Sequence, residues 1–510
     1  MGLTGMVFST TAIAVGAVVY WAKTSTQGQE VPSLGRRCTV GGHVIKRTRT
    51  MRSTHRLAPA LAVVFVAATV VAVFPPKAGA VGLPPGTTVV SPPSTVASDC
   101  SVDVTKPLYD WLNSLPEGTP SNPVEVVFAP GGCYQVDGML FLRGFTDFDF
   151  NGNGATFRQT FRKPGDTKND PSPPNRPPYC GSSDFPNANG SRPPHMDVMW
   201  FIEGGCDLVF ENMDIEGNNT SGRGSAIRRA QDAGIELAGV QRGLVTNDTI
   251  HGVYGDFVTV FGLHEAPTGG PSYPSLDITI SDNTMKASGR QGVTVVYGQR
   301  VAVTGNTIAG NIPNAAIDLE SDVVAGTEAD INVSNNTISG ATWLFSARTG
   351  AHLFDIAFEN NTVGVWRVQM HPLTATAGHD ITVGDNSASG PSFWNKPWSM
   401  AFGNLATVLV TGNSVPMAPP TKVFVHIGTR HASTDVAVQD NILNPTSGSP
   451  AGFLPTPVTA KQNVKVTQCN NQTADGTPLD TTAHPPNRLQ CVSWTPAQPV
   501  PPALPEFVTT

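Results

Sequence analysis

Charged residues are scarce in this chain: they make up 14% of its 510 residues. No helical period runs through the apolar residues between positions 282 and 441, where short stretches alternate as strands do. No Cys-x-x-Cys pair occurs, so the sequence offers no zinc motif of that kind. What is frequent is Gly (51) and Pro (44), a composition typical of many short strands separated by corners.

Basic residues are fewer still once the start of the chain is set aside. Residues 1–80 hold nine of the 32 Lys and Arg residues and one of the 39 acidic residues, so the remainder carries a net charge of −15. Such a chain is not expected to bind nucleic acid, because phosphate binding needs clustered Lys and Arg. The same charge disfavours a polyanionic substrate unless a basic strip or bound calcium reverses the local field.

One short phrase recurs along the chain: an apolar strand, then Asn, then usually Thr or Ser and an aliphatic residue. Intervals of 23 to 30 residues indicate a solenoid repeat, and the alternation makes it a β-solenoid. Stacked Asn side chains can hydrogen-bond from coil to coil, a structural role favoured here over glycosylation. Cys469 stands where the next Asn is expected, so the ladder is predicted to end there. The repeated residues are Asn283, Asn306, Asn336, Asn361, Asn386, Asn413 and Asn441.

The start of the chain is predicted to direct export. After Met51 come a basic stretch, an apolar core and small residues, the layout of a secretory signal cleaved after Ala80. The protein is therefore expected to be secreted or on the surface of a bacterium, to touch a membrane only through an uncleaved leader, and to be a monomer. The expected organisation is an over-extended start or membrane segment at 1–50, a signal peptide at 51–80, a linker at 81–99, the main domain at 100–491 with a polar insertion at 162–196, and an unstructured Pro-rich tail at 492–510.

Six of the seven cysteines follow the leader, as expected for an exported protein with disulfides. Six cysteines allow fifteen pairings. The simplest set joins sequence neighbours, and its pairs are Cys100–Cys133, Cys180–Cys206 and Cys469–Cys491.

Residues 105–118 place apolar side chains at helical spacing, and this predicted helix is well placed to cap the first coil. Together with VVFAPGGCYQVDGMLFL (126–142), FDFNGNGATF (148–157), GCDLVFENMDIEG (205–217) and the Asn repeats, it is similar to secreted proteins of the pectin-lyase-like superfamily. The resemblance covers about residues 100–470. It implies an all-β fold, a single-stranded right-handed parallel β-helix with an N-terminal capping helix. It says less about activity, because the superfamily includes lyases, hydrolases, epimerases and proteins without catalysis.

A second strand in each coil predicts a row of polar side chains on one outer face. With Ile235, Val258, Val293 and Ile317 inward, Glu236, Thr259, Thr294 and Asp318 point outward, and Glu320 follows Asp318 on the same side. Asp318 and Glu320 are about 6.6–6.8 Å apart along a strand. This spacing is compatible with an acid and a base that act across a water molecule. Asp256, two coils away, is the alternate carboxylate.

The remaining candidates are contacts to substrate. Each has a plainer alternative: carboxylates in water, a surface ion pair of Arg290 with Asp318 or Glu320, or simple packing. Aromatic residues that could stack on sugars or merely pack are Phe257, Phe261, Tyr297, Trp343 and Trp366. His195 and His371 could be acid/base groups or surface residues. The predicted substrate-binding set is Glu236, Arg290, Gln291, Tyr297, Arg348, Arg367 and His371.

Missing motifs narrow the predicted chemistry. The signature motifs of polygalacturonases, pectate lyases and mannuronan epimerases are absent, and the predicted face has no lysine to serve as the base of an elimination. The favoured function is a glycoside hydrolase acting on a cell-envelope or environmental polysaccharide, without a cofactor. The alternatives are a non-catalytic surface scaffold that binds a glycan or a protein, and a polysaccharide lyase that uses calcium.

Overall fold

The computed structural model describes residues 85–160, 180, 198–219, 232–263, 273–320, 327–347, 352–370, 378–391, 396–428, 434–460, 464, 466–480, 491–493 and 495–505. The predicted leader at 1–80 lies outside these residues, as does the insertion at 162–196 apart from Cys180. No helix in the part described is long and apolar enough to span a membrane.

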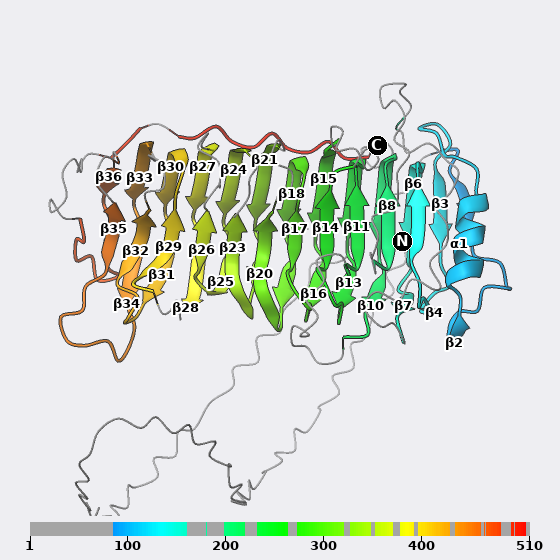
Figure 1. Ribbon diagram of the computed structural model, residues 1–510, viewed down its shortest axis with the longest axis horizontal. Helices are drawn as coiled ribbons and strands as arrows, with labels where there is room; N and C mark the ends of the chain where they lie inside the picture. Colours follow the sequence, from blue (N-terminus) through cyan, green and yellow to red (C-terminus); the bar gives the residue numbers. More distant parts are fainter. Residues whose placement is uncertain are drawn as a thin grey trace, which may run out of the picture. The chain divides into compact units, whose positions relative to one another are not determined.

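Successive coils each add a strand to three parallel sheets, which run side by side along the solenoid (Figure 1). Sheet 1 contains, in spatial order, β1 (Thr88–Val90), β3 (Val124–Val127), β6 (Thr146–Asn151), β9 (Cys206–Glu211), β12 (Gln241–Thr246), β15 (Ser275–Ser281), β18 (Gly298–Thr304), β21 (Thr327–Ser334), β24 (His352–Glu359), β27 (Gly378–Gly384), β30 (Leu405–Thr411), β33 (Thr434–Gln439) and β36 (Val466–Cys469).

Sheet 2 includes, from Thr284 onward, the strands that directly follow the Asn rungs. It contains β2 (Asp99–Asp103), β4 (Cys133–Gln135), β7 (Thr156–Arg158), β10 (Asp214–Glu216), β13 (Thr249–His251), β16 (Thr284–Lys286), β19 (Thr307–Ala309), β22 (Thr337–Ile338), β25 (Thr362–Val365), β28 (Ser387–Gly390), β31 (Ser414–Met417) and β34 (Ile442–Pro445).

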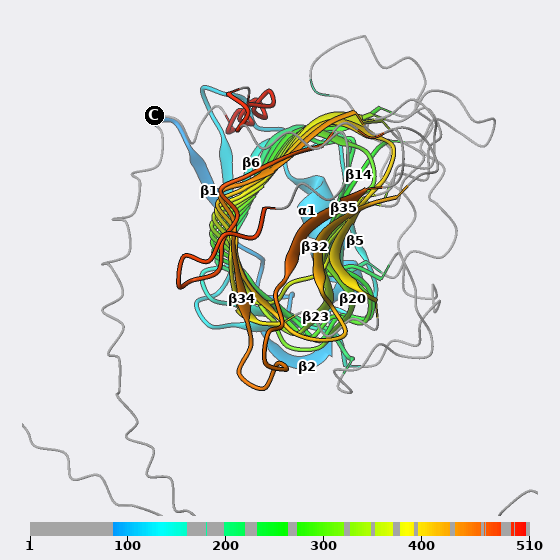
Figure 2. The ribbon, with the colours of Figure 1, turned by 90° about the vertical axis from the view of Figure 1, so that its left-hand side faces the viewer.

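Sheet 3 completes each coil and carries the candidate site. It contains β5 (Leu140–Arg143), β8 (Trp200–Glu203), β11 (Ile235–Ala238), β14 (Val258–Phe261), β17 (Val293–Val295), β20 (Ile312–Leu319), β23 (Ala341–Ala347), β26 (Val368–Met370), β29 (Trp398–Phe402), β32 (Val423–Ile427) and β35 (Thr456–Ala460). Viewed along the solenoid, the coils superpose (Figure 2).

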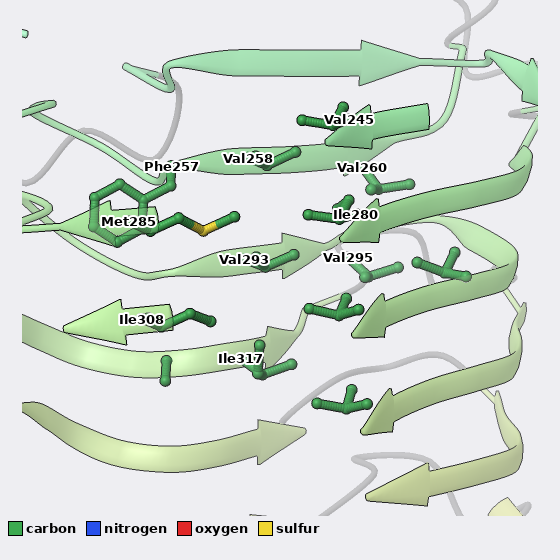
Figure 3. Packing of buried hydrophobic residues seen from close by; sticks show 14 of the residues in the cluster. Val245, Phe257, Val258, Val260, Ile280, Met285, Val293, Val295, Ile308 and Ile317 are labelled. Carbon is green, nitrogen blue, oxygen red and sulfur yellow. The ribbon is translucent and has the colours of Figure 1, made fainter. Parts of the chain in front are cut away.

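Alternate side chains of each strand point inward and fill the interior of the solenoid. Val258, Val293 and Ile317 stack on one another from neighbouring coils, opposite Val245 and Ile280 of sheet 1 (Figure 3). The helix α1 (Thr105–Ser114) buries Leu108 and Leu112 and packs beside β5 at the first coils, in the position predicted for a cap.

The asparagine ladder is confirmed and extended. The amide nitrogen of each predicted rung donates to the side-chain oxygen of the next, at 2.9–3.0 Å. The ladder does not end at Cys469, as predicted, because Asn441 donates to Asn471. The left-handed residue is the one before each rung, such as Asp282 or Asn335, rather than the rung itself. The rung is thereby free to use its amide for stacking.

The three disulfides join the predicted neighbours: Cys100–Cys133, Cys180–Cys206 and Cys469–Cys491. Two segments differ from expectation. Within the predicted linker, β1 pairs with β3. The tail, expected to be unstructured, runs back along the solenoid, where Val500 and Ala503 donate backbone N–H groups to Asp330 and Asp277 (Figure 1).

Candidate active site on the outer face of sheet 3

The predicted row of outward side chains exists and is in register. Glu236 pairs with Thr259, Thr259 with Thr294, and Thr294 with Asp318, and Ser346 continues this outer column on β23. The inward neighbours Ile235, Val258, Val293 and Ile317 belong to the core. The Asn spacing therefore predicted the register over four coils.

The row is not the open surface that the sequence suggested. Glu236 is 1% exposed, Thr294 0% and Asp318 5%, although they point away from the interior of the coil. Asp256 and Gln291, from the corners before β14 and β17, are also buried. Polar groups removed from water in this way need partners, or their charge states change.

Arg290 joins two of the predicted carboxylates. Its Nη1 donates to Asp256 Oδ2 at 2.9 Å, and its Nη2 donates to Glu320 Oε2. Burial lowers the pKa of Arg290, but the charges of Asp256 and Glu320 outweigh that effect and raise it. The ion pair with Glu320 that the sequence left as an alternative is thus present, and the guanidinium also holds a second carboxylate.

Asp256 has more hydrogen-bond donors around it than Asp318, the buried aspartate of the outer column. Besides Arg290, it accepts hydrogen bonds from the Gln291 backbone N–H at 3.0 Å and from Thr294 Oγ1 at 2.7 Å. Burial raises its pKa to about 6, and Arg290 and Thr294 limit the rise. These donors stabilise the ionised form of Asp256 near neutral pH.

Asp318 has a different environment. Burial and then the nearby charge of Glu320 raise its pKa to about 8, against the hydrogen bond from Ser346 and the charge of Arg290. The Gln291 side-chain amide contacts its Oδ2. Asp318 is therefore protonated at neutral pH, beside the ion-paired and partly exposed Glu320.

Comparison with known proteins agrees with this architecture. A family profile described as a right handed beta helix region matches residues 200–366. The gene product 12 of bacteriophage phi29 is 15% identical, with a TM-score of 0.55, over 76% of this chain and 53% of the phage chain, so this chain spans about half its length. The fold is a right-handed parallel β-helix.

Other β-helices with solved structures are more distant. The endo-xylogalacturonan hydrolase of Aspergillus tubingensis is 13% identical over 73% of this chain and 99% of its own, with a TM-score of 0.48. The catalytic unit of an alpha-1,3-glucanase of Streptomyces thermodiastaticus is 15% identical over 81% and 72%, with a TM-score of 0.46. No curated protein matches this sequence significantly. The prediction of a right-handed parallel β-helix is confirmed.

A fifth carboxyl group near this site was not predicted from the sequence. Glu328, at the start of β21, is fully buried and neither of its oxygens has a partner among the described residues. Burial, then Asp318 and Glu320, raise its pKa well above the usual value. The signal was present: Glu328 lies eight residues before Asn336, and the same offset gives Ser275, Gly298, Leu353, Gly378 and Leu405 in other coils. Glu236, Asp256, Asp318, Glu320 and Glu328 together are called the carboxyl cluster below.

Glu236 belongs to the cluster by its electrostatics as well as its position. Burial and the charge of Asp256 raise its pKa to about 8, and its Oε1 has no partner among the described residues. A neutral, buried Glu236 is poorly placed for the role of substrate contact that was predicted for it.

The predicted substrate contacts outside the cluster have other partners or lie elsewhere. Arg367 donates to the Thr342 carbonyl at 2.9 Å and lies over the ring of Trp343, 5.7 Å from its centre. Tyr297 is half-buried, and burial raises its pKa. Phe257 and Trp366 are core residues, so packing is their role, whereas Phe261 and Trp343 are partly exposed. Arg348, His371 and His195 fall outside the described residues.

Proposed function

We propose that this β-helix is a carbohydrate-active hydrolase that cleaves a glycosidic bond in a polysaccharide outside the cell. The observation that carries the proposal is the unlike environment of neighbouring carboxyl groups: Asp318 is buried, and burial and Glu320 raise its pKa to about 8, whereas Asp256 and Glu320 both form ion pairs with Arg290. Glycoside hydrolysis needs one protonated and one ionised carboxyl group on opposite sides of the scissile bond.

Each member of the cluster has a role in this proposal. Asp318 donates its proton to the leaving oxygen. Glu320, whose side chain is 35% exposed, accepts a proton from the attacking water. Asp256 and Arg290 hold Glu320 in place, so Arg290 acts on the base rather than on the sugar as first predicted. The charge-assisted hydrogen bonds from Arg290 hold both carboxyl groups in position.

Two other functions remain to be separated by experiment. Elimination by a lyase requires a base that takes a proton from a uronate, and Arg290 does not fit that role because its two carboxylate partners raise its pKa. A non-catalytic glycan-binding scaffold is favoured by one observation, the nearly complete burial of Asp256 and Glu236.

Incubation of the purified protein with a broad panel of neutral and acidic polysaccharides separates these functions. The hydrolase releases new reducing ends without ultraviolet absorption, and Asp318→Asn abolishes the release. Unsaturated products that absorb in the ultraviolet and disappear with EDTA point to a calcium-dependent lyase. Binding without any product, retained in Asp318→Asn, points to the scaffold and contradicts the proposal.

A further inference from the structure

Asp256 and Asp318 are connected by a continuous series of polar side-chain contacts. Thr294 Oγ1 lies 2.7 Å from Asp256 Oδ2 and 2.5 Å from the side-chain oxygen of Gln291. At its other end the Gln291 amide contacts Asp318 Oδ2. All four side chains are 0–5% exposed. Each contact in this series must therefore contain a hydrogen that one of the four side chains supplies.

Counting hydrogens leaves two consistent arrangements. The Thr294 hydroxyl has one hydrogen, so it donates to only one of its two oxygen neighbours. If it donates to Gln291 Oε1, Asp256 must be protonated and donate to Thr294, while Gln291 Nε2 donates to Asp318 Oδ2, which needs no proton of its own for this contact. If the amide is rotated by 180°, Nε2 donates to Thr294, the hydroxyl donates to ionised Asp256, and Asp318 must carry the proton to reach Oε1. The two ends of a glutamine amide are assigned from such networks.

We propose that Gln291 couples Asp256 and Asp318 into a unit that holds one proton, and that the orientation of its amide selects the aspartate that carries it. The same proton satisfies the chain in both arrangements; only its position and the amide orientation differ. Gln291 is then a positioning residue for the acid, and not the substrate contact that the sequence predicted.

The surrounding charges select the second arrangement at rest. Arg290 and the Gln291 backbone N–H face Asp256 and stabilise its negative charge. Glu320 lies near Asp318 and disfavours charge there, against the weaker opposing effects of Ser346 and Arg290. Glu236 faces Asp256 and works in the opposite direction, but its own carboxyl is neutral at pH 7. The ordering of the pKa values, about 6 for Asp256 and about 8 for Asp318, agrees with this arrangement.

The inference rests on the proposed function for its catalytic meaning, which is that Gln291 keeps the acid loaded at neutral pH. The coupling itself is measurable without substrate. We would label aspartate side-chain carboxyls with ¹³C in the full chain and titrate them by NMR, with Asp256→Asn and Asp318→Asn to assign the signals.

The readout is the effect of Asp256→Asn on the pKa of Asp318. When Gln291 is retained, Asp256→Asn should lower the pKa of Asp318 by more than about one pH unit, the magnitude typical of strongly interacting sites. Gln291→Met keeps the length of the side chain but removes the link, so the same substitution should then shift Asp318 by less than half as much. Gln369→Met, at an outward position of β26, is the matched control and should retain the full shift.

Thr294→Val breaks the same chain at another link and should reproduce the loss of coupling; it decides the matter if Gln291→Met does not fold. The inference is overturned if Asp256→Asn shifts the pKa of Asp318 by the same amount in the wild-type protein, in Gln291→Met and in Thr294→Val. In that case only charge acting through space connects Asp256 and Asp318. Failure of the polysaccharide panel would leave the titration result intact, so the two proposals fail separately.

Discussion

The asparagine ladder and the carboxyl cluster bury polar side chains in the same solenoid, but they satisfy them differently. Asn361 donates to the carbonyls of Val333 and Glu359 and to the next rung, and it accepts from Asn336, so its amide is fully used and carries no charge. In the cluster, oxygens of Glu236 and Glu328 have no partner among the described residues, and burial raises their pKa values. The ladder is built for stability, whereas the cluster sacrifices stability for unusual protonation states.

The largest expected effect is on activity, when a residue of the carboxyl cluster is replaced. Asp318→Asn removes the proton donor and should lower kcat by about 10²- to 10⁴-fold, the usual contribution of a general acid. Asp214→Asn, which removes a carboxylate on sheet 2 away from the cluster, should retain activity. Equal rates of product formation by wild type and Asp318→Asn would show that the cluster is not the acid site.

The pH dependence of stability should differ between the two regions. Because the folded-state pKa of Glu236 is raised to about 8, the protein prefers the neutral form, and stability is lost as pH rises from the unfolded value towards 8. Glu236→Gln should therefore gain stability relative to wild type between about pH 5 and 8, by up to about 1.4 kcal/mol per pH unit. Urea unfolding at several pH values measures this. Glu117→Gln, at an exposed position, gives the baseline; a parallel response of the two variants contradicts the prediction.

Within the ladder, loss of a single rung should lower the free energy of unfolding at every pH. Asn361→Ala leaves buried groups of two neighbouring coils without partners and should destabilise the fold by about 3 kcal/mol, since each unsatisfied group costs roughly 1–3 kcal/mol. Thr362→Ala, at the exposed next position, is the control. A loss of stability in Asn361→Ala that varies with pH as strongly as the gain expected for Glu236→Gln would contradict this difference between the two regions.

The smallest effect is expected at the surface of α1. Lys106 and Asp110 form an exposed i,i+4 ion pair at 2.6 Å. Lys106→Ala should change the unfolding free energy by less than about 0.5 kcal/mol, and less again in high salt. A larger change, measured by the same urea titration, would show that the capping helix depends on this contact.

The sequence was sufficient to predict the register of the strands, but it did not predict which side chains contact one another. Asn spacing placed Glu236, Thr294 and Asp318 in one column because a β-strand alternates strictly and the rungs count the residues. It missed the rung at Asn471, because an interval of 28 residues to Cys469 fits the repeat as well as the true interval of 30.

The chemistry of the site depended on features without a period. Arg290 and Asp256, which contact each other, both lie at corners outside the strands of the repeat. Glu328 lies at a core position, equivalent to Leu353 in the next coil, so the alternation that predicts the outward residues does not point to it. Its departure from Gly, Ser or Leu at that position of the repeat would have revealed it.

The most direct test of the central claim, that Asp318 is a neutral acid at physiological pH, is the pH profile of kcat/KM on the best substrate of the polysaccharide panel. We expect an alkaline limb near pH 8, where Asp318 loses its proton, and no such limb in the residual activity of Asp318→Asn. Activity that is constant through pH 8, or an alkaline limb that persists unchanged in Asp318→Asn, would contradict it.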